Sequence, residues 1–265
     1  MKHPKEEQLS ICITTMVSGL YEWYVPLFLY CGLKAYPEYD FKVLLRGRTN
    51  LPDTYKSHIL DNRYSDYPQN GPTTAALRFI EGEKEFSEYD CCLITDVDVL
   101  LMREDPKLVT QHLAHMIQYK MECYCNYQSH QLPGGYRCSG VHFIMKDWWE
   151  RTRESRMKWM FNAKNGECSE KDSDEIMLGE IIRDSGLNDP TEKQLLWNIH
   201  GIHLKRWWPK ANPRELPQAG AQESLLMQGL LEDEEFMELA SMCAGHLPKI
   251  SGIVGTIRQV IRGGR

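Results

Sequence analysis

The sequence predicts an α/β fold with a mixed, mainly parallel sheet that is flanked by helices. Two observations predict this class. The segments 11–17, 21–36 and 41–45 carry apolar residues in the strand, helix and strand patterns of a βαβ unit, whose strands are parallel. Farther along, the apolar run at 91–95 is short and continuous, which is typical of a strand buried on both faces of a sheet.

The composition is that of a globular protein with a substantial core. Of the 265 residues, 42% are hydrophobic and 26% are charged, and the net charge of −6 gives no indication of a nucleic-acid partner. The composition changes after Pro213. We therefore expect a main domain over residues 1–213 and a C-terminal helical extension over residues 214–265.

The cysteines and the N-terminal residues indicate the compartment. Nine cysteines lie scattered in apolar segments, which is typical of buried thiols in a reducing environment rather than of a disulfide framework. Residues 1–7 lack the apolar core of a signal peptide, and no apolar run reaches the length of a membrane span. We expect a cytoplasmic protein without a transmembrane segment.

The first βαβ unit consists of residue types that favour its elements. The strand over 11–17 is rich in β-branched residues, and the helix over 21–36 tolerates Pro26 near its first turn. Thr14 and Thr15, toward the carboxyl end of the strand, are candidates to line a nucleotide pocket. The alternative is that they are ordinary strand threonines.

A long polar loop at 46–71 precedes the next helix, which we expect to begin at Thr73 or Thr74 and to run through Lys84. Arg78 stands among apolar neighbours in this helix. It could be a surface residue, but a helix that leads directly into the apolar run at 91–95 would hold it near a phosphate or a carboxylate, which the arginine fork suits.

Two carboxylates follow that buried strand. Asp96 and Asp98 lie where the strand leaves the sheet, with Val97 between them. Side chains at i and i+2 of a strand project to the same side, so both carboxylates can face one point. Two such anions repel unless a proton or a cation lies between them. The pair therefore predicts a site for Mg²⁺ or Mn²⁺, with a phosphate completing the coordination.

The middle of the chain continues the alternation of helices and strands. We expect a helix that ends near Tyr119, strands over 122–127 and 139–145 with a turn at 132–137 between them, and an amphipathic helix that starts at Asp147. The tryptophans and the methionine on that last helix are expected to lie in the core.

An acidic, turn-like segment at 167–175 precedes a helix over 176–182. Its carboxylates, Asp172, Asp174 and Glu175, are candidates for catalysis or substrate binding. Helix caps use the same residue types, so each of them could equally be structural.

A final strand is expected over 195–204, with His200 and His203 near its exit. A histidine that arrives near an aspartate pair could complete a metal site. An acidic amphipathic helix over 224–242 is expected to pack on the domain. The segment 250–265 could contact an anionic membrane, although a packed or frayed helix is the preferred interpretation.

The order of these features resembles that of the GT-A glycosyltransferases, above all glycogenin and the lipopolysaccharide galactosyltransferases. The resemblance covers about residues 10–210. It rests on a series of motifs in this order: Ala76-Leu77-Arg78-Phe79, Tyr89 to Asp98, Ser139-Gly140-Val141, Asp172-Ser173-Asp174-Glu175, and Ile202-His203-Leu204 before Lys205 and Trp207. It implies a GT-A fold, which is Rossmann-like.

The resemblance implies a metal centre. Asp96 and Asp98 would bind Mn²⁺ or Mg²⁺, and His203 would supply the third protein ligand. His200 is the competitor, because the alignment shifts by three residues depending on which tryptophan is matched. The metal would neutralise a diphosphate leaving group.

The resemblance also implies the substrates: a nucleoside-diphosphate sugar as donor, with a UDP-sugar expected, and a hydroxyl of a glycan or other glycoconjugate as acceptor. The residues that it places at the donor are Lys205 for the diphosphate, Arg78 for the sugar or a phosphate, Thr14 and Thr15 for the base, and Val97 between the two aspartates. The polar loops at 47–71 and 127–137 are where we expect the acceptor.

Two departures from the family pattern leave the transferred sugar and the stereochemical outcome open. Ser139 stands where the family has an asparagine, and the acidic turn lacks the family's glutamine. If the reaction inverts the anomeric centre, Asp172, Asp174 or Glu175 is the base that deprotonates the acceptor hydroxyl.

Two rival hypotheses come from other classes. Asp96 also fits the nucleophile of haloacid-dehalogenase-like phosphatases, although that family places its motif on the first strand. The other rival is a non-catalytic zinc module, whose ligands would be Cys123, Cys125, Cys138 and His142.

Overall fold

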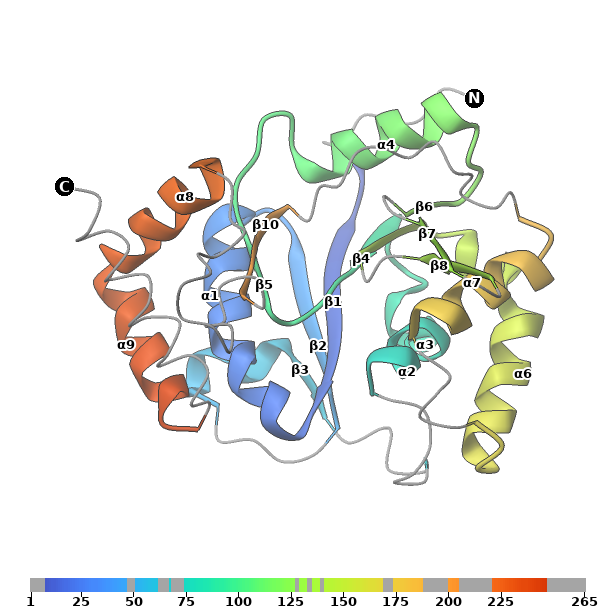
Figure 1. Ribbon diagram of the computed structural model, residues 1–265, viewed down its shortest axis with the longest axis horizontal. Helices are drawn as coiled ribbons and strands as arrows, with labels where there is room; N and C mark the ends of the chain where they lie inside the picture. The colour runs from blue at the N-terminus through green and yellow to red at the C-terminus, as the bar shows by residue number, and fades with distance from the viewer. Residues whose placement is uncertain are drawn as a thin grey trace.

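The computed structural model describes residues 8–46, 51–61, 67, 74–126, 129–132, 135–138, 141–168, 174–187, 200–204 and 221–246. A six-stranded sheet with the order β3-β2-β1-β4-β9-β6 forms its centre (Figure 1). Its strands are β1 (Ile11–Ser18), β2 (Asp40–Arg46), β3 (Ile59–Asp61), β4 (Cys91–Ile94), β6 (Tyr124–Asn126) and β9 (His142–Met145). The first four strands in that order are parallel, and β9 is antiparallel to both of its neighbours. The expected mixed, mainly parallel sheet is confirmed.

Two smaller sheets accompany the central one. In the first, β5 (Val99–Leu101) pairs antiparallel with β10 (Gly201–His203). In the second, β7 (Ser129–Leu132) pairs antiparallel with β8 (Gly135–Cys138). The expected turn over 132–137 is therefore wrong in extent. Because Leu132 pairs with Gly135, most of that segment belongs to a hairpin whose connection has the commonest length, two residues.

Helices lie on both sides of the central sheet. They are α1 (Val25–Ala35), α2 (Thr74–Ile80), α3 (Glu83–Phe86), α4 (Leu108–Tyr119), α5 (Trp148–Arg151), α6 (Arg153–Lys164), α7 (Asp174–Asp184), α8 (Ala221–Leu231) and α9 (Glu234–Ala244). The 3₁₀ helices η2 (Gly19–Tyr24) and η3 (Asp53–His58) join them. In Figure 1, α1, α8 and α9 lie to the left of the sheet, and α2, α6 and α7 lie to its right.

The helix that carries Arg78 is shorter than expected. The sequence predicts a helix through Lys84, but α2 ends at Ile80 and α3 begins only at Glu83. Gly82 separates them with a left-handed φ of 97°, and a Cβ there would lie 2.7 Å from the Phe86 ring. Only glycine combines this backbone conformation with such a close approach of a ring.

The core is apolar around β4, as the sequence predicts. All four residues of β4 are buried, and so are Trp148 and Trp149 at the start of α5. All nine cysteines are free and buried, in agreement with the expectation of buried thiols. Within the described part of the chain, no helix is long and apolar enough to cross a membrane.

The C-terminal region forms two helices where the sequence predicts one over 224–242. The chain leaves helical geometry at Asp233, whose carboxylate accepts a hydrogen bond from the Phe236 backbone N–H at 3.2 Å and so caps α9. The same carboxylate accepts a hydrogen bond from the Tyr30 hydroxyl at 2.7 Å and pairs with Lys34, which fastens α9 to α1. The domain boundary at 213 stays a prediction, and residues 250–265 lie outside the described residues.

Candidate active site

The aspartate pair lies directly beyond the carboxyl end of β4. The ladder between β1 and β4 ends with a hydrogen bond from the Thr95 backbone N–H to the Thr14 carbonyl, at 3.0 Å. The chain then turns, and the Val99 backbone N–H donates to the Asp96 carbonyl at 3.2 Å. Val97 is buried within this turn, at 5% exposure. The turn therefore anchors the backbone on both sides of the two carboxylates.

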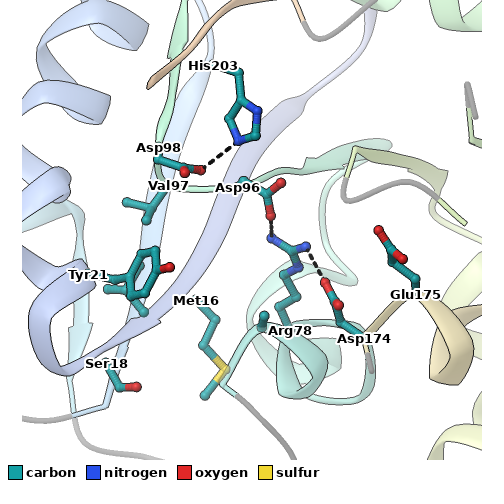
Figure 2. A pocket seen from close by; sticks show the side chains of 12 residues that line it. Met16, Ser18, Tyr21, Arg78, Asp96, Val97, Asp98, Asp174, Glu175 and His203 are labelled. Atoms are coloured by element: carbon teal, nitrogen blue, oxygen red, sulfur yellow. Dashed lines mark hydrogen bonds and ion pairs between the residues drawn. The ribbon is translucent and has the colours of Figure 1, made fainter. Parts of the chain in front are cut away.

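A histidine from a distant part of the sequence joins this pair. One ligand atom each from Asp96, Asp98 and His203 lies within 4.8 Å of the other two, which is close enough for all three to bind one ion. The His203 Nε2 atom is 3.3 Å from the Asp98 Oδ1 atom (Figure 2). Two carboxylates and an imidazole suit a divalent cation such as Mn²⁺. No other described group of His, Cys, Asp and Glu side chains meets this geometry.

The close pairing of β10 with β5 determines which histidine reaches the aspartates. His203 pairs with Val99, next to Asp98, and the Leu204 backbone N–H donates to the Asp98 carbonyl at 2.9 Å. At Gly201 the strands are so close that a Cβ would lie 2.0 Å from the Leu100 carbonyl oxygen. His200 instead contacts Glu104 and a second buried histidine. Of the two competing histidines, the structure brings only His203 to the aspartates.

Arg78 connects the aspartate pair to α7. Its guanidinium donates to the Asp96 Oδ1 atom at 2.5 Å and to the Asp174 Oδ2 atom at 3.0 Å (Figure 2). It also donates to the Thr95 carbonyl at 3.0 Å. The side chain is only 3% exposed. Sequence reasoning expected this arginine near a phosphate or a carboxylate, and the structure places it between two carboxylates.

The charge of Arg78 is maintained by these neighbours. Burial alone would lower the pKa of the guanidinium, because a charge loses hydration inside a protein. The carboxylates of Asp96, Asp174 and Asp98 outweigh this effect, and the pKa of Arg78 lies above its ordinary value. Arg78 is therefore a permanent cation at the base of the site.

A cavity of about 500 Å³ opens above these groups. This volume is in the range of small-molecule sites. The residues that line it are Met16, Val17, Ser18, Tyr21, Ala75, Arg78, Asp96, Val97, Asp98, Asp174, Glu175 and His203. The wall thus holds four carboxylates and, among the described residues, one guanidinium. Among the described residues the wall is thus mainly anionic, and a bound cation would offset this charge for a diphosphate.

Thr14 and Thr15 are not among the residues that line the cavity. Strand β1 continues to Ser18, three residues beyond Thr15, so both threonines lie inside the sheet, at 2% and 1% exposure. Met16 and Ser18 line the cavity in their place. The strand predicted over 11–17 ends one residue before β1 does, and the error was to place Thr14 and Thr15 at its carboxyl end, although Met16 and Val17 still follow them.

Tyr21 is a cavity residue that sequence reasoning missed. It lies on η2, directly after β1, and its ring is 51% exposed at the edge of the cavity. Burial raises the pKa of Tyr21, and the negative charges of Asp98 and Asp96 raise it further. An aromatic residue shortly after the predicted first strand was the signal in the sequence, but its exposure at the cavity could not be read from it.

The remaining candidates divide into three groups. Asp174 and Glu175 lie together in the first turn of α7 and line the cavity. Asp172 and Lys205 lie outside the described residues. Val97 lines the cavity between the aspartates, and its role at the donor stays a prediction.

The zinc hypothesis is contradicted. Its four proposed ligands are all described, and they form no group that could hold a metal. Cys125 instead lies 2.9 Å from His115, through its Sγ and the Nδ1 atom. His142 packs against aromatic rings, with its centroid 4.7 Å from that of Trp148. These side chains belong to the core.

Fold and site together define an α/β protein with a candidate divalent-metal centre at the edge of a small-molecule cavity. No protein-family model matches the chain, and neither does any curated protein.

Three solved structures to which the chain is similar are glycosyltransferases. A galactosyltransferase LgtC in complex with donor and acceptor sugar analogues is 17% identical, with 63% of this chain and 69% of that chain covered and a TM-score of 0.38. An active-site mutant of LgtC is 14% identical, with 87% and 95% covered and a TM-score of 0.48. The apo form of the glycosyltransferase GlyE from Streptococcus pneumoniae TIGR4 is 14% identical, with 66% and 44% covered and a TM-score of 0.43. At these levels of similarity, function has to be argued from the site.

Proposed function

We propose that this protein is a metal-dependent glycosyltransferase of the GT-A type. It transfers a sugar from a nucleoside-diphosphate sugar, with a UDP-sugar as the expected donor, to a hydroxyl of a glycan or another acceptor. The observation that supports this proposal most is the convergence of Asp96, Asp98 and His203 at the edge of a cavity of about 500 Å³. That cavity lies beyond the carboxyl ends of β1 and β4, where open α/β sheets usually bind nucleotides.

The charges in the cavity favour a metal-bound diphosphate. Asp96, Asp98 and His203 would hold the ion, and the imidazole among the ligands favours Mn²⁺ over Mg²⁺, which prefers oxygen. The bound ion would neutralise the negative charge that develops on the departing diphosphate. Arg78 holds Asp96 by one nitrogen and Asp174 by the other, so it links the aspartate pair to α7 through a shared cation.

The acceptor hydroxyl needs a base if the reaction inverts. Asp174 already accepts a hydrogen bond from the buried Arg78 guanidinium, at 3.0 Å, and is held by it at the base of the site. Glu175 lines the cavity from the next position of α7. We therefore assign the base to Glu175 and an orienting role to Asp174.

Tyr21 fits the base of the nucleotide. Its half-exposed ring lies at the edge of the cavity, and aromatic rings stack on nucleobases without selecting strongly among them. This assignment replaces Thr14 and Thr15 as the residues expected at the base.

The proposal is tested with the double variant in which Asp96→Asn is combined with Asp98→Asn. We expect wild-type protein to bind a UDP-sugar in calorimetry only when Mn²⁺ is present. The double variant should lose this binding, because two of the three metal ligands lose their charge. Asp53→Asn is the control, since Asp53 is exposed, pairs only with Lys56 among the described partners, and lies away from the cavity.

Full metal-dependent binding by the double variant would contradict the proposal. A screen of nucleotide sugars by thermal shift, with and without Mn²⁺, identifies the donor, since ligands that bind only the folded state raise its melting temperature. Formation of a phosphorylated Asp96 after incubation with acetyl phosphate would instead support the phosphatase.

A further inference from the structure

A chain of three hydrogen-bonded side chains lies behind β10 and takes no part in lining the cavity. The Glu104 Oε2 atom is 2.7 Å from the His200 Nδ1 atom. On the other side of the ring, the His200 Nε2 atom is 3.0 Å from the His112 Nε2 atom. Both histidines are completely buried, and the Glu104 side chain is 22% exposed. Glu104 lies in the segment after β5, His200 directly precedes β10, and His112 lies on α4.

The proton positions in this chain follow from its chemistry. A carboxylate only accepts, so the His200 Nδ1–H donates to Glu104. The His200 Nε2 atom shares a hydrogen bond with the Nε2 atom of His112. Burial lowers the pKa of His112 well below its ordinary value, and the neighbouring His200 lowers it further, so His112 stays neutral. Its ring also stacks on Phe143, with centroids 4.6 Å apart and planes 7° apart. The orientation of the His200 ring is thus determined from both ends.

The backbone at His200 needs such support. Its φ of 58° is in the left-handed region, which is unfavourable for a residue with a Cβ. The His200 carbonyl accepts a hydrogen bond from the Met102 backbone N–H at 2.9 Å, and Gly201 follows with no space for a side chain. Strand β10 has only three residues and, among the described strands, pairs with β5 alone; such short two-stranded pairings are marginal by themselves.

We infer that the chain Glu104–His200–His112 positions the metal ligand His203 by holding the beginning of β10 in place. The inference depends on the metal centre of the proposed function. None of the three side chains touches the ion site; they act through the backbone of β10, which ends at His203. They are positioning residues, and they control the affinity of the metal site for its ion in the absence of nucleotide.

The test measures Mn²⁺ affinity of the full chain without nucleotide, by electron paramagnetic resonance. His112→Phe keeps an aromatic ring against Phe143 but removes the hydrogen bond to His200. We expect Mn²⁺ binding to weaken about tenfold, as for loss of an outer-shell partner of a metal ligand. His112→Gln should restore most of the affinity, because its amide N–H₂ can donate from the position of the imidazole Nε2–H.

His115→Phe is the matched control. His115 lies on the same helix, three residues from His112, and is buried to a similar degree. Its partner is Cys125 in β6 rather than a residue at β10. It should therefore lower the melting temperature but leave the affinity for Mn²⁺ unchanged.

Equal Mn²⁺ affinity of His112→Phe and His115→Phe would overturn the inference. If His112→Phe does not fold, Glu104→Ala serves instead, because Glu104 reaches solvent and its loss disturbs the core less. Unchanged affinity of Glu104→Ala would likewise overturn the inference. Wild-type protein that binds no Mn²⁺ would overturn the metal centre and with it the proposed function, which is a separate outcome.

Discussion

Replacing Arg78 by leucine should affect stability and metal binding in opposite directions. The side chain is 3% exposed and donates hydrogen bonds to Asp96, Thr95 and Asp174. Its guanidinium also lies over the Phe79 ring, 4.8 Å from the centroid. Leucine fills much of the apolar volume of the stem but leaves two carboxylates without their shared cation.

The loss of stability can be estimated from the structure. Removal of one partner from a buried ion pair costs about 3 to 5 kcal/mol. The Asp96 and Asp174 side chains are 35% and 24% exposed, so water compensates part of the loss and the lower end, about 3 kcal/mol, applies. For a chain of this size the melting temperature should fall by about 6 to 12 °C.

The same substitution should not weaken the binding of the metal, in contrast to its effect on stability. Without Arg78 the aspartates repel each other and Asp174 more strongly, and a divalent cation relieves this repulsion. Mn²⁺ should therefore bind at least as tightly as in the wild type and should raise the melting temperature of the variant by more than that of the wild type. Differential scanning fluorimetry at several Mn²⁺ concentrations, with calorimetry for the affinity, measures both effects.

Two other arginines provide controls. Arg153 pairs with Glu83 on the surface, and Arg153→Leu should leave the unfolding free energy nearly unchanged, because exposed ion pairs contribute little to stability. Arg156 is buried and also pairs with Glu83, so Arg156→Leu should destabilise without altering Mn²⁺ binding. The reasoning is refuted if Arg78→Leu lowers the melting temperature no more than Arg153→Leu does, or if the folded variant no longer binds Mn²⁺.

Two further predictions concern backbone packing and pH. Gly201→Ala should separate β10 from β5 and weaken Mn²⁺ binding in calorimetry, because the new Cβ would lie 2.0 Å from the Leu100 carbonyl oxygen. Gly229 lies in a helix with open space around it, and Gly229→Ala should stabilise the fold by about 0.5 to 1 kcal/mol. The hydrogen bond with Lys34 holds the pKa of Asp233 at about 2, against burial, which raises it. A lowered pKa adds stability to the fold at pH values above the ordinary pKa near 3.8, and this added stability is lost as the pH falls from about 4 to 2. Urea unfolding should therefore show about 1 kcal/mol of acid-dependent stability, which Asp233→Asn lacks. An unchanged acid dependence in that variant, or unchanged Mn²⁺ affinity in Gly201→Ala, would contradict the respective prediction.

Much of the fold was predictable because its signals are local. The strands at 11–18 and 91–94 are continuous apolar runs, and a run of this kind indicates burial on both faces wherever it occurs. The errors lie at the ends of elements. Gly82 ends a helix that propensity alone would continue, and residues 16–18 of β1, rather than the threonines before them, reach the pocket. End positions depend on tertiary contacts, such as the Phe86 ring beside Gly82.

The assembly of the site was only partly predictable. The aspartate pair and its position after a buried strand can be recognised from residue order, whereas the contacts of Arg78 with both Asp96 and Asp174 cannot. Asp174 is 96 residues away from Arg78 in the sequence, and nothing in the local pattern of either helix records that they face each other. Tyr21 was missed for the same reason, because its exposure at the cavity depends on where β1 ends.

The sequence by itself determined the alternation of strands and helices, the burial of β4, and the position of Asp96 and Asp98 directly after one buried strand, since each follows from residue type and order within a few positions. The two carboxylates meet through the turn closed between Asp96 and Val99 rather than through the alternation of a strand, because β4 ends at Ile94. Only the tertiary structure decided between His200 and His203. Both histidines lie in one short segment, and the choice between them depends on the antiparallel register of β10 with β5. Gly201 holds this register in place, because it lies so close to Leu100 that no side chain would fit there. Register is a property of two segments about 100 residues apart, so no pattern within either segment contains it.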